Sequence, residues 1–163
     1  MTGFRLDKGG LIDRRQKINF SFNGQQVTGY KGDTIASALM ASGHMLVGRS
    51  FKYHRPRGIM SAGVEEGGAL FNTGDGAARI PNVKGTVTEI SEGLKVYSQN
   101  VFPSPGFDLG AINGLIAPFI TAGFYYKTFM GPFSNTKFWM LCERFIRKAA
   151  GLGRASREAD PSI

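Results

Sequence analysis

Five basic side chains within nine consecutive positions are the strongest chemical signal in this chain. The string GRSFKYHRPRG carries Arg49, Lys52, His54, Arg55 and Arg57. A guanidinium can hold a phosphate through paired hydrogen bonds, and flanking glycines let backbone amides approach an anion closely. We therefore expect this segment to contact the phosphate of a cofactor or a neighbouring subunit. The alternative is a solvated loop that is held by ordinary ion pairs with Glu65 and Glu66.

The other reactive residue types form no recognisable catalytic or metal-binding set. Cys142 is the single cysteine, so the chain can form neither an internal disulfide nor a cluster of thiolates. This cysteine usage is typical of a reducing compartment, and we expect the protein to be cytoplasmic. The adjacent carboxylates Glu65 and Glu66 have no histidine or nucleophile placed with them by any motif. We expect no catalytic residue and no metal ligand in this chain.

The net charge of +8 is concentrated in the first third of the sequence. Residues 1–57 hold ten Lys and Arg against three Asp and Glu, whereas residues 58–163 hold ten against nine. Such a surplus attracts the phosphates of a nucleic acid, the phosphates of a dinucleotide or an acidic partner. The charge alone does not choose among these three.

The elements that must position the basic segment begin with a predicted β-hairpin over residues 17–30. Apolar and polar residues alternate in KINFSF, and the pair Asn23-Gly24 favours a two-residue turn before QQVTGY. A helix is predicted over residues 34–42, capped by Asp33 or Thr34, with an apolar face that includes Ile35 and Leu39. A hairpin followed by a short helix packed across it is the opening of a β-grasp fold.

The basic segment after this helix is predicted to be a loop, because Pro56 interrupts it. GGALFN (67–72) favours a short strand, and GTVTEI (85–90) and LKVYSQ (94–99) favour a second hairpin by alternation. The sequence therefore predicts an N-terminal extension (1–16) and then one α+β domain (17–100).

Residues 101–163 differ in composition from the predicted domain. The first part is rich in Phe, Pro and Gly without a clean period, and includes Tyr125-Tyr126, so it should lie against a larger body. Its longest apolar stretch, 109–124, is too short and too interrupted by Pro118 and glycines to span a membrane. A helix is predicted over 137–150, with Trp139 and Cys142 on or beside its apolar face.

Two long strings give the chain a family resemblance. LVGRSFKYHRPRGIMSAGVEE and FWMLCERFIRKAAGLGRA resemble the alpha subunits of heterotetrameric sarcosine oxidases, and the likeness runs from about Gly9 to Arg154. Residues 17–100 also resemble ferredoxin-like domains attached to amine-oxidising flavoenzymes. The resemblance implies a β-grasp, two-iron two-sulfur ferredoxin-like domain, followed by an irregular aromatic-rich segment and a helix that leads to a nucleotide-binding domain beyond this chain.

In the cluster-bearing relatives, Pro-Arg-Gly precedes cysteines at the plant-type ferredoxin spacing. By this resemblance the four ligand positions fall on Ser61, Glu66, Ala69 and Thr86. None of them is a cysteine, and alanine cannot ligate iron. We therefore expect a ferredoxin-like frame that has lost its redox centre, which nearly excludes an electron-carrying ferredoxin.

The resemblance further implies an enzyme that demethylates sarcosine oxidatively to glycine, giving formaldehyde or methylene-tetrahydrofolate and hydrogen peroxide. NAD, FMN and FAD belong to the assembled enzyme, and this chain alone is expected to bind none of them and to be inactive. The implied partners are the rest of the alpha subunit and the beta, gamma and delta subunits. The alternative is a free-standing basic β-grasp module that binds nucleic acid or another partner through the first third of the chain. We favour the subunit because the resemblance accounts for the same basic residues.

Overall fold

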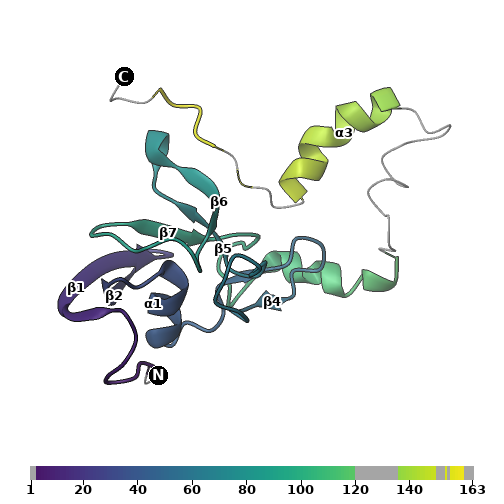
Figure 1. The fold of residues 1–163 in the computed structure, drawn as a ribbon. Helices are drawn as coiled ribbons and strands as arrows, with labels where there is room; N and C mark the ends of the chain where they lie inside the picture. The colour runs from purple at the N-terminus through teal and green to yellow at the C-terminus, as the bar shows by residue number, and fades with distance from the viewer. Residues whose placement is uncertain (1–2, 120–135, 150–152, 154, 160–163) are drawn as a thin grey trace.

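The computed structural model describes residues 3–119, 136–149, 153 and 155–159 of the 163-residue chain. Within these residues, five strands form a mixed sheet in the order β2-β1-β7-β5-β6, and two more form a small ladder, β3-β4. The strands are β1 (Asp13–Phe22), β2 (Gln25–Lys31), β3 (Gly48–Arg49), β4 (Pro56–Arg57), β5 (Leu70–Thr73), β6 (Ile80–Lys84) and β7 (Lys95–Ser98). The helices are α1 (Ile35–Ala41) and α3 (Thr136–Ala149), with 3-10 turns η1 (Gly76–Ala78), η2 (Leu109–Gly114) and η3 (Ala117–Phe119) (Figure 1).

The first hairpin is confirmed. β1 and β2 pair antiparallel around Asn23 and Gly24, whose φ angles of 49° and 82° both lie in the left-handed region that a two-residue hairpin turn requires. β1 begins at Asp13, inside the segment that was predicted to be an extension. The two strands bury Phe20, Phe22 and Val27 on one face of the sheet.

The predicted helix is also confirmed, one residue shorter at each end. Thr34 is its cap: the Thr34 hydroxyl accepts from the Ser37 amide at 3.2 Å, and the Ser37 hydroxyl accepts from the Thr34 amide at 2.9 Å. The helix buries Ile35, Ala36, Ala38 and Leu39 in the same core as Phe20 and Phe71. A helix packed on a mixed sheet in this order confirms the α+β, ferredoxin-like prediction.

The second predicted hairpin is wrong. β7 pairs in parallel with β1 and antiparallel with β5, and the strand that pairs with β5 on its other side is β6, which ends at Lys84. Residues 85–90 instead pass under the start of α1, where the Ile35 amide donates to Thr88 and the Ile90 amide donates to Asp33. Residues 85–90 therefore form no ladder with LKVYSQ, and Val87, an apolar residue of their alternating pattern, is 51% exposed.

The N-terminal segment, which we define as residues 3–12, is anchored on the domain. Arg5 donates two hydrogen bonds to the buried carboxylate of Asp33, at 2.7 and 3.3 Å, and its guanidinium lies 4.9 Å from the ring centroid of Tyr30. Arg14 donates to the Leu6 carbonyl at 3.1 Å. The segment consequently covers one side of α1.

The C-terminal part exposes many apolar side chains. α3 confirms the predicted helix, yet Phe138, Leu141 and Phe145 on its predicted apolar face are 42%, 65% and 58% exposed. Trp139 and Cys142, which were read as core, are partly buried. Tyr125-Tyr126 lies outside the described residues. Within the described residues, no helix is both long and apolar enough to cross a membrane.

Candidate functional site: the basic loop and the Glu66 loop

Two loops face each other across a cavity of about 730 Å³. We call residues 48–58 the basic loop and residues 59–69 the Glu66 loop. The basic loop contributes Arg49 and Arg57 to the wall, the Glu66 loop contributes Glu66 and Gly68, and the far wall is formed by Asn82, Gln99 and Asn100. The cavity therefore brings Arg49 and Arg57 together with Glu66, which is one of the four expected cluster positions, whereas the other three do not line it.

The basic loop is more ordered than the predicted irregular loop. Gly48 and Arg49 of β3 pair with Arg57 and Pro56 of β4. Inside this ladder the Ser50 amide donates to the Arg55 carbonyl at 2.9 Å, and the Arg55 amide donates to the Ser50 hydroxyl at 3.0 Å. The five basic residues are thus held on a short hairpin.

Arg49 is committed to the interior of this hairpin. Its side chain is 12% exposed, and it donates to the carbonyls of Pro105 and His54, each at 2.8 Å. The bond to Pro105 joins the hairpin to the start of the aromatic-rich segment, and the bond to His54 lies within the hairpin. Arg49 lines the cavity with two of its five N–H groups already engaged by these carbonyls.

His54 and Asp108 form the second connection between the two segments. His54 Nδ1 lies 2.6 Å from Asp108 Oδ2, and the Asp108 side chain is fully buried. Asp108 Oδ1 accepts from the amides of Phe102 and Gly110, at 2.8 and 3.3 Å, while Arg49 Nε lies 3.8 Å from Oδ2. One buried carboxylate therefore ties together the basic loop and residues 102–110.

The remaining cations of the loop gather around one ring. Lys52 Nζ and the Arg55 guanidinium lie 4.8 and 4.9 Å from the centroid of Tyr53. Arg55 and Arg57 are exposed, whereas Lys52 is half-buried. Of the five predicted residues, Arg55 and Arg57 thus face solvent. Arg49 and His54 instead bond to other parts of the chain.

The alternative prediction, that Glu65 and Glu66 form ion pairs with the basic loop, is wrong. In the described part of the chain, its ion pairs run to Asp108. Sequence reasoning missed Asp108, but a signal was present: it is the single acidic residue between Glu92 and Glu143, in a stretch rich in Phe, Pro and Gly. An acid in so apolar a context needs buried partners.

Glu66 is the centre of its own loop. Its side chain is buried, with 5% of the residue exposed. Oε2 accepts from the amides of Met60 and Ser61 at 2.6 and 2.7 Å, and Oε1 accepts from the amide of Gly68 at 2.6 Å. Successive backbone N–H groups that converge on one anion form a nest. Here the anion is supplied by the chain itself.

The four expected cluster positions are all occupied with other contacts. Ser61 touches Glu66 through both its amide and its hydroxyl, the latter at 3.4 Å. Ala69 is 1% exposed and belongs to the hydrophobic core. The Thr86 hydroxyl donates to the Gly63 carbonyl at 2.8 Å. Within the described residues, no three His, Cys, Asp or Glu side chains are grouped so as to hold a metal ion.

The fold and the loop define a class of protein. A family model described as "2Fe-2S iron-sulfur cluster binding domain" matches residues 15–101, and the chain belongs to this family. Over 162 residues it is also 56% identical to the sarcosine oxidase subunit alpha of Rhizobium meliloti (strain 1021), a match that covers 99% of this chain and 16% of the relative.

Two shorter matches point to the same kind of relative. The chain is 46% identical over 66 residues to the sarcosine oxidase subunit alpha of Corynebacterium sp. (strain U-96), covering 40% of this chain and 7% of the relative. It is 48% identical over 73 residues to that of Corynebacterium sp. (strain P-1), covering 42% and 8%. The crystal structure of L-proline dehydrogenase from P. horikoshii aligns with a TM-score of 0.43 and 18% identity over 56% of this chain and 17% of that chain, a likeness too distant to argue from.

The residues at the expected positions do not fit the cluster that gives the family its description. A two-iron two-sulfur cluster needs four thiolates, or two thiolates and two imidazoles. The four positions offer a hydroxyl, a carboxylate that is already bonded to three amides, a methyl group and a second hydroxyl. The one cysteine, Cys142, lies on α3. The four positions therefore supply no thiolate that could hold the iron of such a cluster.

The charge of Glu66 should make the stability of the domain depend on pH. Burial raises the pKa of Glu66, but hydrogen bonds from the amides of Gly68, Met60 and Ser61 together outweigh it and hold that pKa below its ordinary value. A carboxylate with a lowered pKa in the folded state contributes stability above its unfolded pKa, about 4.3, and loses it as the pH falls through the folded pKa. Chemical denaturation of Glu66→Gln from pH 7 to pH 3 should show a shallower loss of stability than the unmodified chain. Parallel curves for the two proteins would contradict this role.

Proposed function

We propose that this chain is the N-terminal region of the alpha subunit of a multi-subunit sarcosine oxidase. The observation that carries the proposal is the 56% identity over 99% of the chain to an alpha subunit of that name. The chain spans 16% of that relative, so the activity resides mainly in the rest of the assembly. The reaction we assign to the assembly is the oxidative demethylation of sarcosine to glycine, with formaldehyde or methylene-tetrahydrofolate and hydrogen peroxide as the other products.

Within that assembly we assign this region a structural role without a redox centre of its own. The side chains at Ser61, Glu66, Ala69 and Thr86, which we take as vestigial ligand positions, support it because a carboxylate and not sulfur fills the loop. The second support is apolar exposure. Phe102, Phe107, Ile112 and Leu115 are each more than 60% exposed, and the apolar face of α3 is similarly open. Such surface is typical of an interface with a larger body.

The basic loop is proposed as the polar part of this interface. Arg55 and Arg57 point outward on a hairpin that is fixed from behind by Arg49, His54 and Asp108. Preorganised guanidiniums suit a carboxylate of another subunit or a cofactor phosphate. Lys52 adds positive charge beside them. In this proposal no residue of the chain is catalytic.

The cofactors and partners of the assembly follow the same assignment. We propose NAD, FMN and FAD as its cofactors, held outside this chain, and the rest of alpha together with beta, gamma and delta subunits as its partners, in the cytoplasm. Binding to nucleic acid has less support, because Arg49 is largely buried and bonded to two carbonyls, so the exposed phosphate contacts of the loop are confined to a few side chains around Arg55 and Arg57. Strong, salt-sensitive binding of an oligonucleotide would reverse this preference.

Reversing the charge of the outward arginines tests the interface. The tagged chain, co-expressed with the sarcosine oxidase subunits of its source, should retain the beta subunit on affinity purification. Arg55→Glu with Arg57→Glu should reduce the retained beta subunit by about tenfold, since like charges at a rim oppose association. The matched control is Lys17→Glu with Lys31→Glu, the same charge change at two exposed positions of the first hairpin.

Two outcomes of this experiment would contradict the proposal. If no sarcosine oxidase subunit is retained by the unmodified chain, the assignment to that enzyme is wrong. If the control and the arginine variant lose the beta subunit equally, the basic loop is not part of the interface, because net charge alone would then explain the effect.

A further inference from the structure

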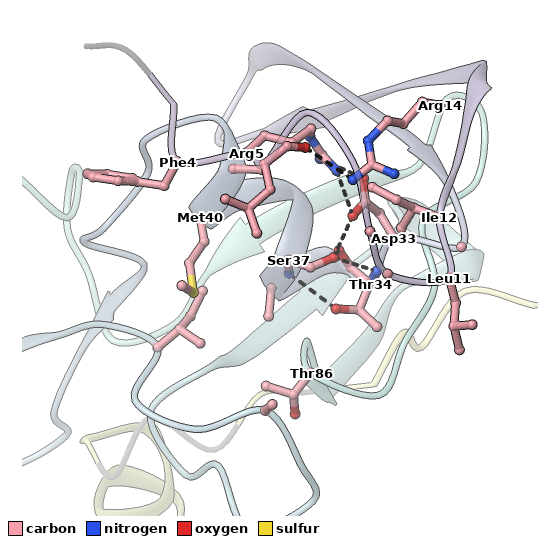
Figure 2. Close-up of a pocket in the computed structure, with 18 of the residues that line it drawn as sticks. Phe4, Arg5, Leu11, Ile12, Arg14, Asp33, Thr34, Ser37, Met40 and Thr86 are labelled. Carbon is pink, nitrogen blue, oxygen red and sulfur yellow. Dashed lines mark hydrogen bonds and ion pairs between the residues drawn. The ribbon is translucent and has the colours of Figure 1, made fainter.

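A second cavity lies between the N-terminal segment, α1 and the Glu66 loop, and Met60 lines both cavities. Its volume of about 950 Å³ is at the upper end of the range for small-molecule sites, roughly 300–1,000 Å³. Apolar side chains dominate its wall, with Phe4, Leu11 and Ile12 from the N-terminal segment, Met40 from α1 and Ile59 from the Glu66 loop. Figure 2 shows these elements around the cavity. None of the five basic side chains of the basic loop lines this second cavity.

The polar groups of this cavity are mostly neutralised within the wall. Asp33 is paired with Arg5 at 2.7 Å, so the two contribute no net charge. Asp33 also accepts from the Ser37 hydroxyl at 2.8 Å and from the Tyr30 amide at 2.9 Å. The Thr34 hydroxyl accepts from the Ser37 amide in the cap of α1. These groups close the polar end of the helix and leave no free carboxylate at the cavity.

Arg14 is a charged residue of the wall that is not neutralised in this way. Its side chain lines the cavity on the same side as Arg5 and Asp33 (Figure 2). One terminal nitrogen donates to the Leu6 carbonyl, but Nε is buried and has no hydrogen-bond partner. Among the described residues the structure shows no ion pair for Arg14 or for Lys8, which also lines the wall. Arg14 and Lys8 are therefore cations of the wall that no carboxylate balances in the described part of the chain.

We propose that this cavity binds an organic anion with an apolar body. The body lies among the apolar side chains of the N-terminal segment, α1 and the Glu66 loop, and the acidic group accepts hydrogen bonds from Arg14 with Lys8 at the rim. Small-molecule sites are lined mostly by apolar side chains, with a few polar or charged groups that fix the orientation of the ligand, and this wall has that composition. A small molecule is favoured over a peptide because the N-terminal segment, anchored through Arg5, already closes one side of the cavity.

Two fluorescent probes of similar shape, one charged and one neutral, distinguish the contribution of the charged groups to binding from that of the apolar wall. The first is 8-anilino-1-naphthalenesulfonate, an anion, and the second is the uncharged N-phenyl-1-naphthylamine. The full chain should bind the anion at one site and more tightly than the neutral probe. Arg14→Gln should weaken the anion by about tenfold, as expected for one charge-assisted hydrogen bond, and leave the neutral probe unchanged.

The neighbouring residue provides the matched control. Arg15 is 91% exposed and pairs with Asp13, so Arg15→Gln should change neither probe. Ala62, exposed at the cavity wall, can be replaced with tryptophan to fill the space, and Ala62→Trp should weaken both probes. If Arg14→Gln does not fold by circular dichroism, Lys8→Gln at an exposed position serves instead, with an expected loss of two- to threefold for the anion alone.

Two results would overturn the proposal. In the first, Arg14→Gln and Arg15→Gln weaken the anionic probe equally, which would mean that general surface charge attracts it. In the second, both probes bind at several sites and are indifferent to Ala62→Trp. The probes would then report an open apolar surface suited to a protein partner.

Discussion

Replacing Glu66 with alanine should lower the free energy of unfolding by about 3 kcal/mol. The substitution leaves the amides of Met60, Ser61 and Gly68 without the acceptor that they share, in a partly buried loop where each loss costs about 1 kcal/mol or more. Urea denaturation followed by circular dichroism measures the change. Amide hydrogen exchange should accelerate at the same three positions.

The control for this variant is the preceding residue. Glu65 is exposed, and its hydrogen bonds, including one from the Gly63 amide at 3.2 Å, are to groups within four residues along the chain, so Glu65→Ala should leave the unfolding transition in place. Glu66→Gln should fall between the two, because its amide oxygen can still accept while its NH₂ group faces a donor. If Glu65→Ala and Glu66→Ala destabilise the domain equally, the nest around Glu66 does not organise the loop.

Removing the carboxylate of Asp108 should have an effect of similar size, also about 3 kcal/mol. Asp108→Ala leaves the Phe102 amide without its acceptor and removes the partner of His54 and the nearby charge of Arg49, all in a buried setting. The connection between the basic loop and residues 102–110 should loosen. Thermal unfolding gives the stability, and hydrogen exchange at Phe102 and Gly110 gives the local effect.

The comparison variant for Asp108 is Asp75→Ala. Asp75 is half-exposed and pairs with Lys95 at 2.7 Å, an interaction that solvent screens. This variant should therefore unfold close to the unmodified chain. If Asp108→Ala were as stable as Asp75→Ala, or if hydrogen exchange at Phe102 stayed slow, Asp108 would not hold the two segments together.

The parts of the fold that the sequence predicted are those set by local chemistry. The turn at Asn23-Gly24 needs two left-handed residues, and the cap at Thr34 needs a hydroxyl three residues before Ser37. The prediction of the second hairpin was wrong because the sequence pattern of residues 85–90 also fits a segment that pairs with a distant part of the chain. The backbone of residues 85–90 bonds to the start of α1, more than 50 positions earlier in the chain, and no local periodicity distinguishes that contact from a strand.

For the candidate site, too, the sequence predicted the features that are local and missed those that depend on distant residues. Clustered charge in a short segment located the basic loop, yet it could not show that Arg49 and His54 turn inward, because their partners Pro105 and Asp108 lie 56 and 54 positions away. Spacing by family resemblance placed Glu66 among the cluster positions. The three amides that converge on it depend on the backbone course of the loop, which residue types alone do not reveal.

The measurement that tests the central claim most directly is the iron and acid-labile sulfide bound after anaerobic reconstitution. The claim is that a ferredoxin-like frame persists here with a carboxylate where thiolates would be needed. The unmodified chain should bind neither element. A variant with Ser61→Cys, Glu66→Cys, Ala69→Cys and Thr86→Cys should bind about two of each, with the visible absorbance of a two-iron two-sulfur cluster. Uptake by the unmodified chain, or a reconstituted four-cysteine variant without iron and sulfide, would contradict the account.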